Sequence, residues 1–199
     1  MKHIAIFASG TGSNARKIIE YFQDSPDVQV ALVVSNKKDA GVLDIAQAHG
    51  IPVEVINRKL FYETEDLLAV LNRHQVDFIV LAGFLWLIPA YLVRAFSKRM
   101  VNIHPALLPK YGGKGMFGMH VHEAVRAANE AETGITIHYV NEHYDEGDII
   151  FQARCPVTPE DSPADIARKV QALEHLHFPG VISQILKHPV FHIKEIRGG

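Results

Sequence analysis

The segment HIAIFASGTGSNA, residues His3–Ala15, decides the fold class. Its first seven residues are mostly apolar and β-forming, so they predict a buried strand that ends in a glycine-rich turn. The segment that follows, NARKIIEYFQ, has Ile18, Ile19 and Phe22 at helical spacing and predicts an amphipathic helix. A buried strand, a tight turn and an amphipathic helix in succession are typical of a parallel sheet covered by helices.

The same alternation continues along the chain. Further strands are predicted at VQVALVVSN, PVEVIN, DFIVLAGF and MVNIHPA, with helical segments between them. After a Gly/Pro-rich loop at Pro109–Met119, a helix is predicted near HEAVRAANE, then an antiparallel pair at GITIHYVN and IIFQARCPV, and a long helix over Pro163–Lys187. We therefore predict a single domain over residues 1–199. Its fold is a Rossmann-like open twisted sheet, mostly parallel with an antiparallel C-terminal part, with helices on both faces.

The composition restricts the class of protein. The chain has 199 residues, 48% of them hydrophobic, and a net charge of -2, which gives no electrostatic reason to expect a nucleic acid or an anionic membrane as partner. No stretch approaches the roughly 20 apolar residues of a membrane span. Cys155 is the only cysteine, which excludes an internal disulfide and is typical of a reducing compartment. We expect a cytoplasmic protein.

The glycine-rich turn predicts a phosphate site. SGTGSNA nearly matches the dinucleotide fingerprint G-x-G-x-x-G/A. The second strand, however, ends at Asn36 rather than at an acid, which disfavours an NAD-linked oxidoreductase. Backbone N–H groups at a helix start, together with Ser13 and Asn14, suit a single phosphate group. The alternative is that Ser13 only caps the helix.

Asn102 and His104 are candidates for chemistry. They alternate along a strand, so they share a face at its end. A second polar cluster, HYVNEHYDEGDII, offers His138 and Asp145, and Asp145 could reach His104 from a turn. An amide and an imidazole could stabilise an oxyanion formed on a carbonyl. A nearby carboxylate would raise the imidazole pKa and help keep the ring charged near neutrality. No Ser or Cys is placed as a nucleophile, which favours direct attack by the substrate. The alternative is a hydrogen-bonded core histidine.

Four motifs together resemble the folate-dependent formyltransferases: FASGTGSN, LAGFLWLIP, NIHPALLPKYGG and GITIHYVNEHYDEGDII. The resemblance covers most of the chain. Chain length and charge favour the members of this family that act on glycinamide ribonucleotide (phosphoribosylglycinamide). The resemblance implies an enzyme of purine biosynthesis that transfers a formyl group to the amine of this substrate. The co-substrate would be 10-formyltetrahydrofolate, and no metal would be required.

The resemblance also implies roles for individual residues. The catalytic residues would be Asn102, His104 and Asp145. Contacts to glycinamide ribonucleotide would come from Gly12, Ser13 and Asn14 at the phosphate and from Gln171 and Glu174 at the ribose. Contacts to the formyl folate would come from Arg58, Leu85, Trp86, Leu87, Ile88, Asn102, Asn141 and Asp145. Arg58 would meet the glutamate tail, and Trp86 departs from a basic residue found in some relatives.

Two alternatives stay open at this point, a 10-formyltetrahydrofolate hydrolase and a non-enzymatic nucleotide-binding module. The loop Gly112–Met119 is longer and richer in glycine than the family pattern, so Lys114, His120 and His122 are further candidates for substrate contact. His120 and His122 have H-x-H spacing, but a metal site needs a fuller set of ligands, and we expect no metal.

Overall fold

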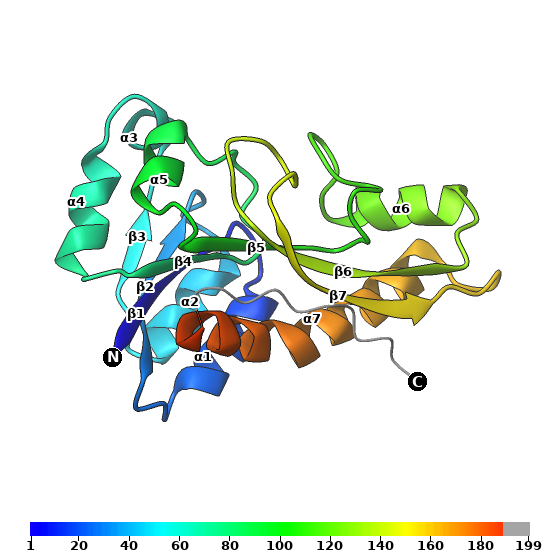
Figure 1. Ribbon diagram of the computed structural model, residues 1–199, viewed down its shortest axis with the longest axis horizontal. Coiled ribbons are helices and arrows are strands. Elements are labelled where there is room, and N and C mark those ends of the chain that lie inside the picture. The colour runs from blue at the N-terminus through cyan, green and yellow to red at the C-terminus, as the bar shows by residue number, and fades with distance from the viewer. Residues whose placement is uncertain (189–199) are drawn as a thin grey trace. The chain divides into compact units, whose positions relative to one another are not determined.

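The structure is a computed structural model that describes residues 1–188 of the chain (Figure 1). Its elements follow in the order β1 (Lys2–Phe7), α1 (Ser13–Phe22), β2 (Val28–Ser35), α2 (Gly41–Ala48), β3 (Val53–Val55), α3 (Arg58–Tyr62), α4 (Asp66–Arg73), β4 (Phe78–Leu81), α5 (Ala90–Ala95), β5 (Met100–His104), α6 (Met119–Ala127), β6 (Glu132–Tyr139), β7 (Ile149–Pro156) and α7 (Pro163–Lys187).

The strand order is β3-β2-β1-β4-β5-β6-β7 in a seven-stranded sheet. The pairs β1–β2, β1–β4 and β2–β3 are parallel, and β6–β7 is antiparallel. The predicted fold class, a mostly parallel sheet with an antiparallel C-terminal part, is confirmed. The chain divides into two compact units, Met1–Val101 and Asn102–Gly199, and the division falls within β5.

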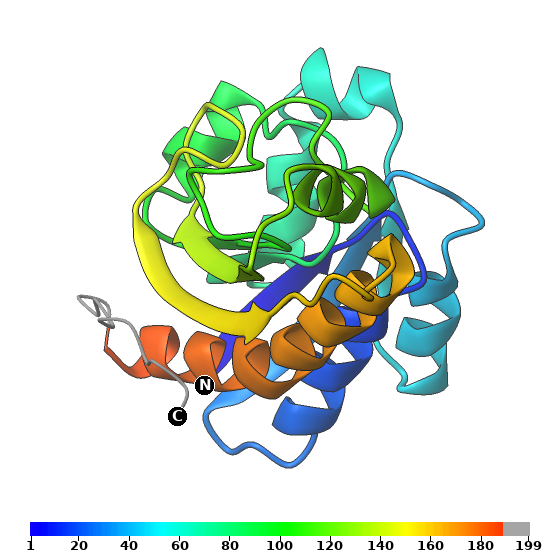
Figure 2. The same cartoon turned by 90° about the vertical axis from the view of Figure 1, so that its right-hand side faces the viewer.

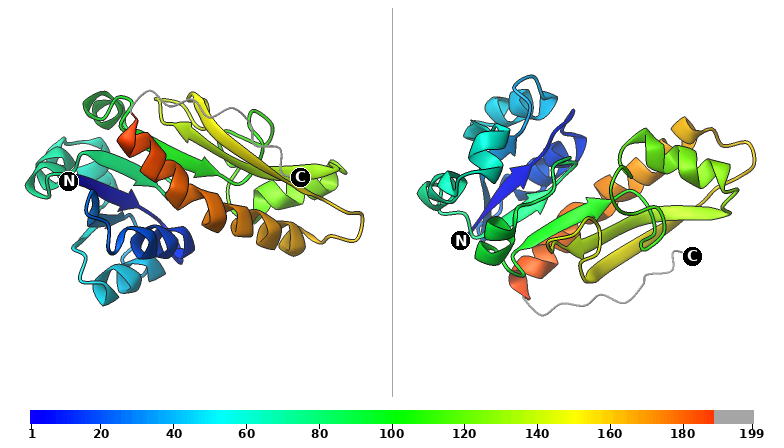
Figure 3. Two further views of the ribbon diagram at one scale, coloured as in Figure 1. Left: turned by 60° about the horizontal axis from the view of Figure 1, so that its bottom comes forward. Right: turned by 90° about the horizontal axis from the view of Figure 1, so that it is seen from above.

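The first unit is built around β1. Ile4 lies opposite Val30 of β2 on one side and Phe78 of β4 on the other. All four residues of β4 are buried, as expected for a continuous apolar run in a parallel sheet. The strand order reverses at β1, so right-handed crossovers place the helices before the reversal on one face of the sheet and those after it on the other. Figure 3 shows α1 and α2 on one side of these strands and α3 and α4 on the other.

The helices of this unit agree with the predicted spacing of apolar residues, except for α3. Ile18, Ile19 and Phe22 of α1 are all buried, as their spacing predicted. The five-residue helix α3 was not predicted, because it is too short to show a period. Its start is nevertheless marked in the sequence: the side chain of Asn57 accepts a hydrogen bond from the Leu60 N–H at 2.9 Å, as an N-cap residue does.

The second unit is built around the β6–β7 pair, in which Ile135 lies opposite Ala153. Helix α7 contacts β6, β7 and α6, and Figure 2 shows it running alongside β7.

The hydroxyl of Thr136 is fully buried; it accepts hydrogen bonds from the Leu108 N–H and the Gln152 amide and donates one to the Ala106 carbonyl. Thr136 therefore fixes the chain that leaves β5.

Within residues 1–188, no helix is both long enough and apolar enough to cross a membrane.

Ser162 forms the start of α7 and offers a test of its stability. Its side chain accepts from the Asp165 N–H at 3.2 Å, and the Asp165 carboxylate accepts from the Ser162 N–H at 2.9 Å, which together make a capping box. We expect Ser162→Ala to lower the free energy of unfolding by about 1 kcal/mol, the usual cost of losing such a cap. Urea unfolding measures this. Ser162→Asn, which can still cap, should be nearly silent, and equal losses in both variants would contradict the assignment.

Candidate active site

Three predicted residues come together in the second unit. Asn102 and His104 lie at the end of β5, and Asp145 lies in the loop between β6 and β7. The Asn102 amide donates to Asp145 Oδ1 at 3.3 Å, and His104 Nδ1 lies 3.5 Å from Asp145 Oδ2. His104 is only 3% exposed, while Asn102 and Asp145 are half-buried. One carboxylate therefore faces both strand residues, with one oxygen toward each.

His138 also belongs to this cluster, although sequence analysis assigned it no role. Its Nε2 lies 3.1 Å from Asn102 Nδ2 and 3.6 Å from Asp145 Oδ1. Its Nδ1 lies 2.8 Å from the carbonyl oxygen of Tyr139, which can only accept. These partners assign the proton to Nδ1, so that Nε2 accepts from the Asn102 amide. His138 thus orients Asn102. Its place in the polar segment HYVNEHYDEGD was the available sequence signal.

Two backbone groups of the loop after β5 complete the cluster. His104 Nε2 lies 2.7 Å from the carbonyl oxygen of Tyr111, and the Gly113 N–H donates to Asp145 Oδ2 at 3.0 Å. The segment Tyr111–Gly113 therefore contacts both members of the His104–Asp145 pair. Sequence reasoning missed these contacts because every residue type except proline carries the same backbone groups.

The pKa of His104 corrects one expectation. Burial lowers it, while the Asp145 carboxylate and the Tyr111 carbonyl raise it, and the net pKa lies below the usual histidine value. Asp145 raises the pKa as expected, but burial has the larger effect. The free energy lost when the charged ring leaves water is greater than the free energy gained from its attraction to the Asp145 carboxylate. The neutral imidazole is thus the favoured form near pH 7. Both ring nitrogens face acceptors, but Tyr111 O lies 2.7 Å from Nε2 whereas Asp145 Oδ2 lies 3.5 Å from Nδ1. The shorter contact favours the proton of the neutral ring on Nε2, and the Nδ1 lone pair then faces Asp145.

Asp145 is the fixed charge of the site. Burial raises its pKa, but His138, His104 and the Gly113 N–H together lower it, and the net pKa lies below the usual value for aspartate. Asp145 is therefore ionised near neutral pH. Its φ angle is 57°, in the left-handed region that non-glycine residues seldom adopt. Such strain is common at functional sites, where the surrounding contacts hold it.

The other candidates of the second unit lie in different surroundings. Lys114 and His120 are exposed, whereas His122 is buried, and burial together with His104 lowers its pKa. Asn141 accepts a hydrogen bond from the His143 N–H at 2.9 Å and so stabilises the turn before Asp145. On α7, Gln171 is exposed and Glu174 is half-buried. Among residues 1–188, no three His, Cys, Asp or Glu side chains are grouped closely enough to hold a metal ion.

The predicted phosphate loop lies in the first unit. Gly12 is the N-cap of α1 with φ 80°, and a Cβ there would lie 2.8 Å from Val42, so only glycine fits. Ser13 and Asn14 are the first two residues of the helix and are half-buried. Ser13 lies one position too late to be the N-cap, and no side-chain cap bond is found at this end of α1 within the described chain. The N-cap position is therefore Gly12 and not Ser13.

The predicted folate residues of the first unit lie beside an aromatic cluster. The Arg58 guanidinium lies 5.1 Å from the centroid of the Trp86 ring, within range of a cation–π interaction. The Trp86 ring also contacts Phe61 at 5.6 Å and Tyr62 at 5.9 Å, and the Tyr62 hydroxyl donates to the Leu87 carbonyl. Arg58 and Leu85 are exposed, Trp86 and Leu87 are half-buried, and Ile88 is buried. Trp86 thus forms part of a partly exposed apolar surface with a cation above it.

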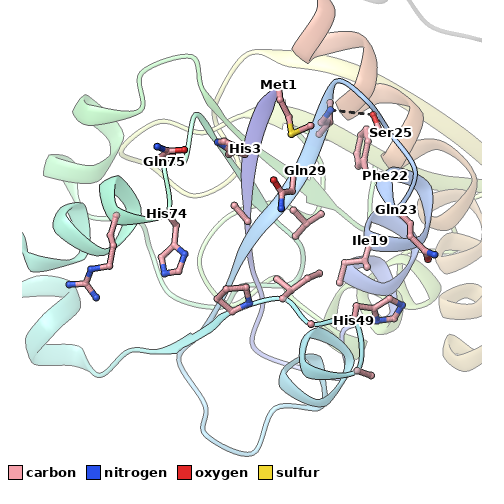
Figure 4. A pocket seen from close by; sticks show the side chains of 18 residues that line it. Met1, His3, Ile19, Phe22, Gln23, Ser25, Gln29, His49, His74 and Gln75 are labelled. Atoms are coloured by element: carbon pink, nitrogen blue, oxygen red, sulfur yellow. Dashed lines mark hydrogen bonds between the residues drawn. The ribbon is translucent and has the colours of Figure 1, made fainter.

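A cavity of about 870 Å³ lies elsewhere in the first unit (Figure 4). It lies beside the first residues of β1 and β2 and the last residues of α1, α2 and α4. Its lining includes Met1, Phe22, Gln29, His49 and His74. None of the predicted site residues lines it. In open α/β sheets ligands bind at the carboxyl ends of the strands, so this cavity is not a candidate for the predicted chemistry.

Comparison with known proteins agrees with the motifs. The family model described as formyl transferase matches residues 2–182. The chloroplastic phosphoribosylglycinamide formyltransferases of Arabidopsis thaliana and Vigna unguiculata are 44% and 40% identical to this chain. Each alignment covers 95% of this chain, and it spans 67% of the Arabidopsis protein and 62% of the Vigna protein.

A solved structure is similar over its whole length. The phosphoribosylglycinamide formyltransferase of Bacillus halodurans is 36% identical with a TM-score of 0.84, and the match covers 97% of this chain and 100% of that chain. The family model, the sequence relatives and the solved structure agree. The chain belongs to the formyl transferase family of enzymes.

Proposed function

We propose that this protein is a phosphoribosylglycinamide formyltransferase of purine biosynthesis, which transfers a formyl group from 10-formyltetrahydrofolate to the amine of glycinamide ribonucleotide. The observation that carries the proposal is the position of the Asp145 carboxylate, which lies 3.3 Å from the Asn102 amide nitrogen and 3.5 Å from His104 Nδ1. The names of the relatives favour the transferase over the hydrolase alternative.

The first chemical step forms a tetrahedral intermediate. The amine nitrogen of the nucleotide attacks the formyl carbon, the carbonyl π electrons move to oxygen, and the amine loses a proton. His104 is neutral with a lone pair on Nδ1, so it accepts that proton. The resulting imidazolium and the Asn102 amide then stabilise the oxyanion. Charge on the oxyanion and on Asp145 raises the pKa of His104 during the step, which makes this transfer favourable.

The second step releases the products. The oxyanion re-forms the carbonyl, the bond between the formyl carbon and N10 of the folate breaks, and N10 takes the proton from His104. Formylated nucleotide and tetrahydrofolate leave, and His104 is neutral again. Asp145 stays ionised throughout and balances the transient charge of the imidazolium. No covalent intermediate with the protein is needed.

Binding roles are assigned to the residues that the family motifs indicated. The N–H groups at the start of α1, with Gly12, Ser13 and Asn14, bind the phosphate. Gln171 and Glu174 bind the ribose. Contacts with the formyl folate are assigned to Leu85–Ile88 in the first unit and, separately, to Asn102, Asn141 and Asp145 in the second. Arg58, above the Trp86 ring, meets the carboxylates of the glutamate tail.

An absorbance assay with a formyl-folate analogue tests the function. Release of the deformylated folate only when glycinamide ribonucleotide is present supports the transferase. Release without the nucleotide indicates the hydrolase, and binding of the nucleotide with no release indicates the non-enzymatic module.

The phosphate loop gives a separate prediction. We expect Ser13→Ala combined with Asn14→Ala to raise KM for the nucleotide about tenfold, with a much smaller change in KM for the folate, because hydrogen bonds to a charged group are lost. Steady-state kinetics with each substrate varied in turn measures both constants. Ser25→Ala, in the turn between α1 and β2, is the control and should change neither. An equal rise for both substrates would mean that the loop does not bind one ligand selectively.

The location and the extent of the domain are also proposals. We infer a cytoplasmic protein from the single cysteine, whereas the Arabidopsis and Vigna relatives are chloroplastic by name. Fractionation of cells of the source organism tests this. A single formyltransferase domain over residues 1–199 stays a prediction, and its last eleven residues, 189–199, lie outside the described part of the chain.

A further inference from the structure

The orientation of the His104 ring depends on a single backbone carbonyl. Nε2 lies 2.7 Å from Tyr111 O, and Nδ1 lies 3.5 Å from Asp145 Oδ2. Both groups can only accept, and Tyr111 O is the nearer one, so it holds the proton of the neutral ring on Nε2 and leaves the Nδ1 lone pair facing Asp145. With the proton on Nδ1 instead, the ring could not act as the base of the proposed reaction. What holds this carbonyl in place therefore matters for the chemistry.

Tyr111 needs an external anchor to hold that position. Its φ angle is 56°, in the left-handed region that is unfavourable for a bulky side chain. It lies in a loop in which Gly113, Gly115 and Gly118 also have positive φ, so neighbouring residues give the backbone little rigidity. The ring hydroxyl of Tyr111 supplies the anchor, because it donates to Glu130 Oε1 at 2.8 Å.

Glu130 is suited to act as that anchor. It lies between α6 and β6, and its Oε1 accepts from both the Tyr111 hydroxyl and the Lys110 ammonium, each at 2.8 Å. These two contacts hold the pKa of Glu130 below its usual value, so it is ionised and a strong acceptor near neutral pH. The same loop segment supplies the Gly113 N–H to Asp145, so its placement affects both members of the His104–Asp145 pair.

We infer that Glu130 is a positioning residue, which acts through the Tyr111 hydroxyl and carbonyl to fix the His104 ring with its proton on Nε2 and its lone pair on Nδ1. The chain of contacts is Glu130 carboxylate, Tyr111 hydroxyl, Tyr111 carbonyl and His104 Nε2, and all of it lies within residues 104–130. The catalytic part of this inference rests on the proposed function. The positioning of the ring and of its proton does not depend on the proposed function.

Three variants test the contacts directly, and a fourth is the control. Tyr111→Phe removes one hydroxyl and keeps the ring. Glu130→Ala removes the anchor, and Glu130→Gln keeps an oxygen that can accept from Tyr111. Glu132→Ala is the matched control, because Glu132 lies two residues further along and pairs with Arg154 instead. The ¹⁵N chemical shifts of the His104 ring report which nitrogen carries the proton and do not require turnover.

In the wild type and in Glu132→Ala we expect the His104 proton on Nε2. In Tyr111→Phe and Glu130→Ala we expect a mixture of the two tautomers and a kcat lowered about tenfold with both KM values nearly unchanged, as for the loss of one orienting hydrogen bond. Glu130→Gln should recover most of kcat. If the variants fold but His104 keeps its proton on Nε2, the inference is wrong. If the tautomer shifts as expected but neither the wild type nor any variant transfers formyl groups, the proposed function fails and the positioning role stands. Tyr111→Phe remains informative if Glu130→Ala does not fold.

Discussion

His104→Ala should lower kcat by about 10²- to 10⁴-fold, the range typical for loss of a general acid–base group. In the proposed reaction His104 accepts the amine proton, stabilises the oxyanion as an imidazolium and returns the proton to the leaving nitrogen. Alanine can do none of these. Single-turnover kinetics with both substrates saturating measures the chemical step separately from product release.

The fold must be checked in the same variant, because His104 is buried. Its loss leaves the Tyr111 carbonyl without a donor, which costs about 1–3 kcal/mol of stability. Thermal unfolding shows whether the variant is still folded at the assay temperature. His49→Ala, an exposed residue at the end of α2, is the control and should keep full activity. A folded His104→Ala enzyme with more than half of the wild-type kcat would make His104 structural.

Asp145→Asn should lower kcat by about 10- to 100-fold while both substrates still bind. Asparagine has nearly the same shape and adopts a φ of 57° as readily as aspartate, so the backbone of the loop is kept. What is lost is the negative charge that stabilises the transient imidazolium, and hydrogen bonds to charged groups contribute about 1.5–3 kcal/mol. Calorimetry of each ligand separates binding from the loss of rate.

The same variant should shift the pH profile in a defined direction. Asp145 raises the pKa of His104, so its replacement by a neutral amide lowers that pKa further. Because His104 acts as a base, kcat/KM of the wild type falls as the pH falls through its pKa, and in the variant this acidic limb moves to lower pH. NMR titration of His104 measures the pKa directly. An unchanged pKa together with near-normal turnover would remove Asp145 from the active site.

Much of the fold could be predicted because its elements are long or strongly apolar. β4 is buried at every position, and the sequence around it shows this as an unbroken apolar run. The 25-residue helix α7 was predicted over its whole length, Pro163–Lys187. The five residues of α3 cover little more than one turn, so no period can appear in them, and only the N-cap Asn57 marks the helix.

The part of the site that consists of side chains was predictable. Asn102, His104 and Asp145 were candidates because their residue types suit carbonyl chemistry and two of them alternate on one strand. The Tyr111 carbonyl and the Gly113 N–H were not predictable, because backbone groups have no sequence signature. The net pKa of His104 was also missed, since it depends on how deeply tertiary packing buries the ring.

The two outer strands have a consequence for association with other chains. A sheet edge exposes unpaired N–H and C=O groups, to which a strand of another molecule can add. β3 offers only three residues at its edge, and Glu54 at its centre would introduce a charge into any added sheet. β7 is longer, but it carries Arg154 and ends at Pro156, which has no N–H to donate. Both edges are therefore poor templates for fibril growth.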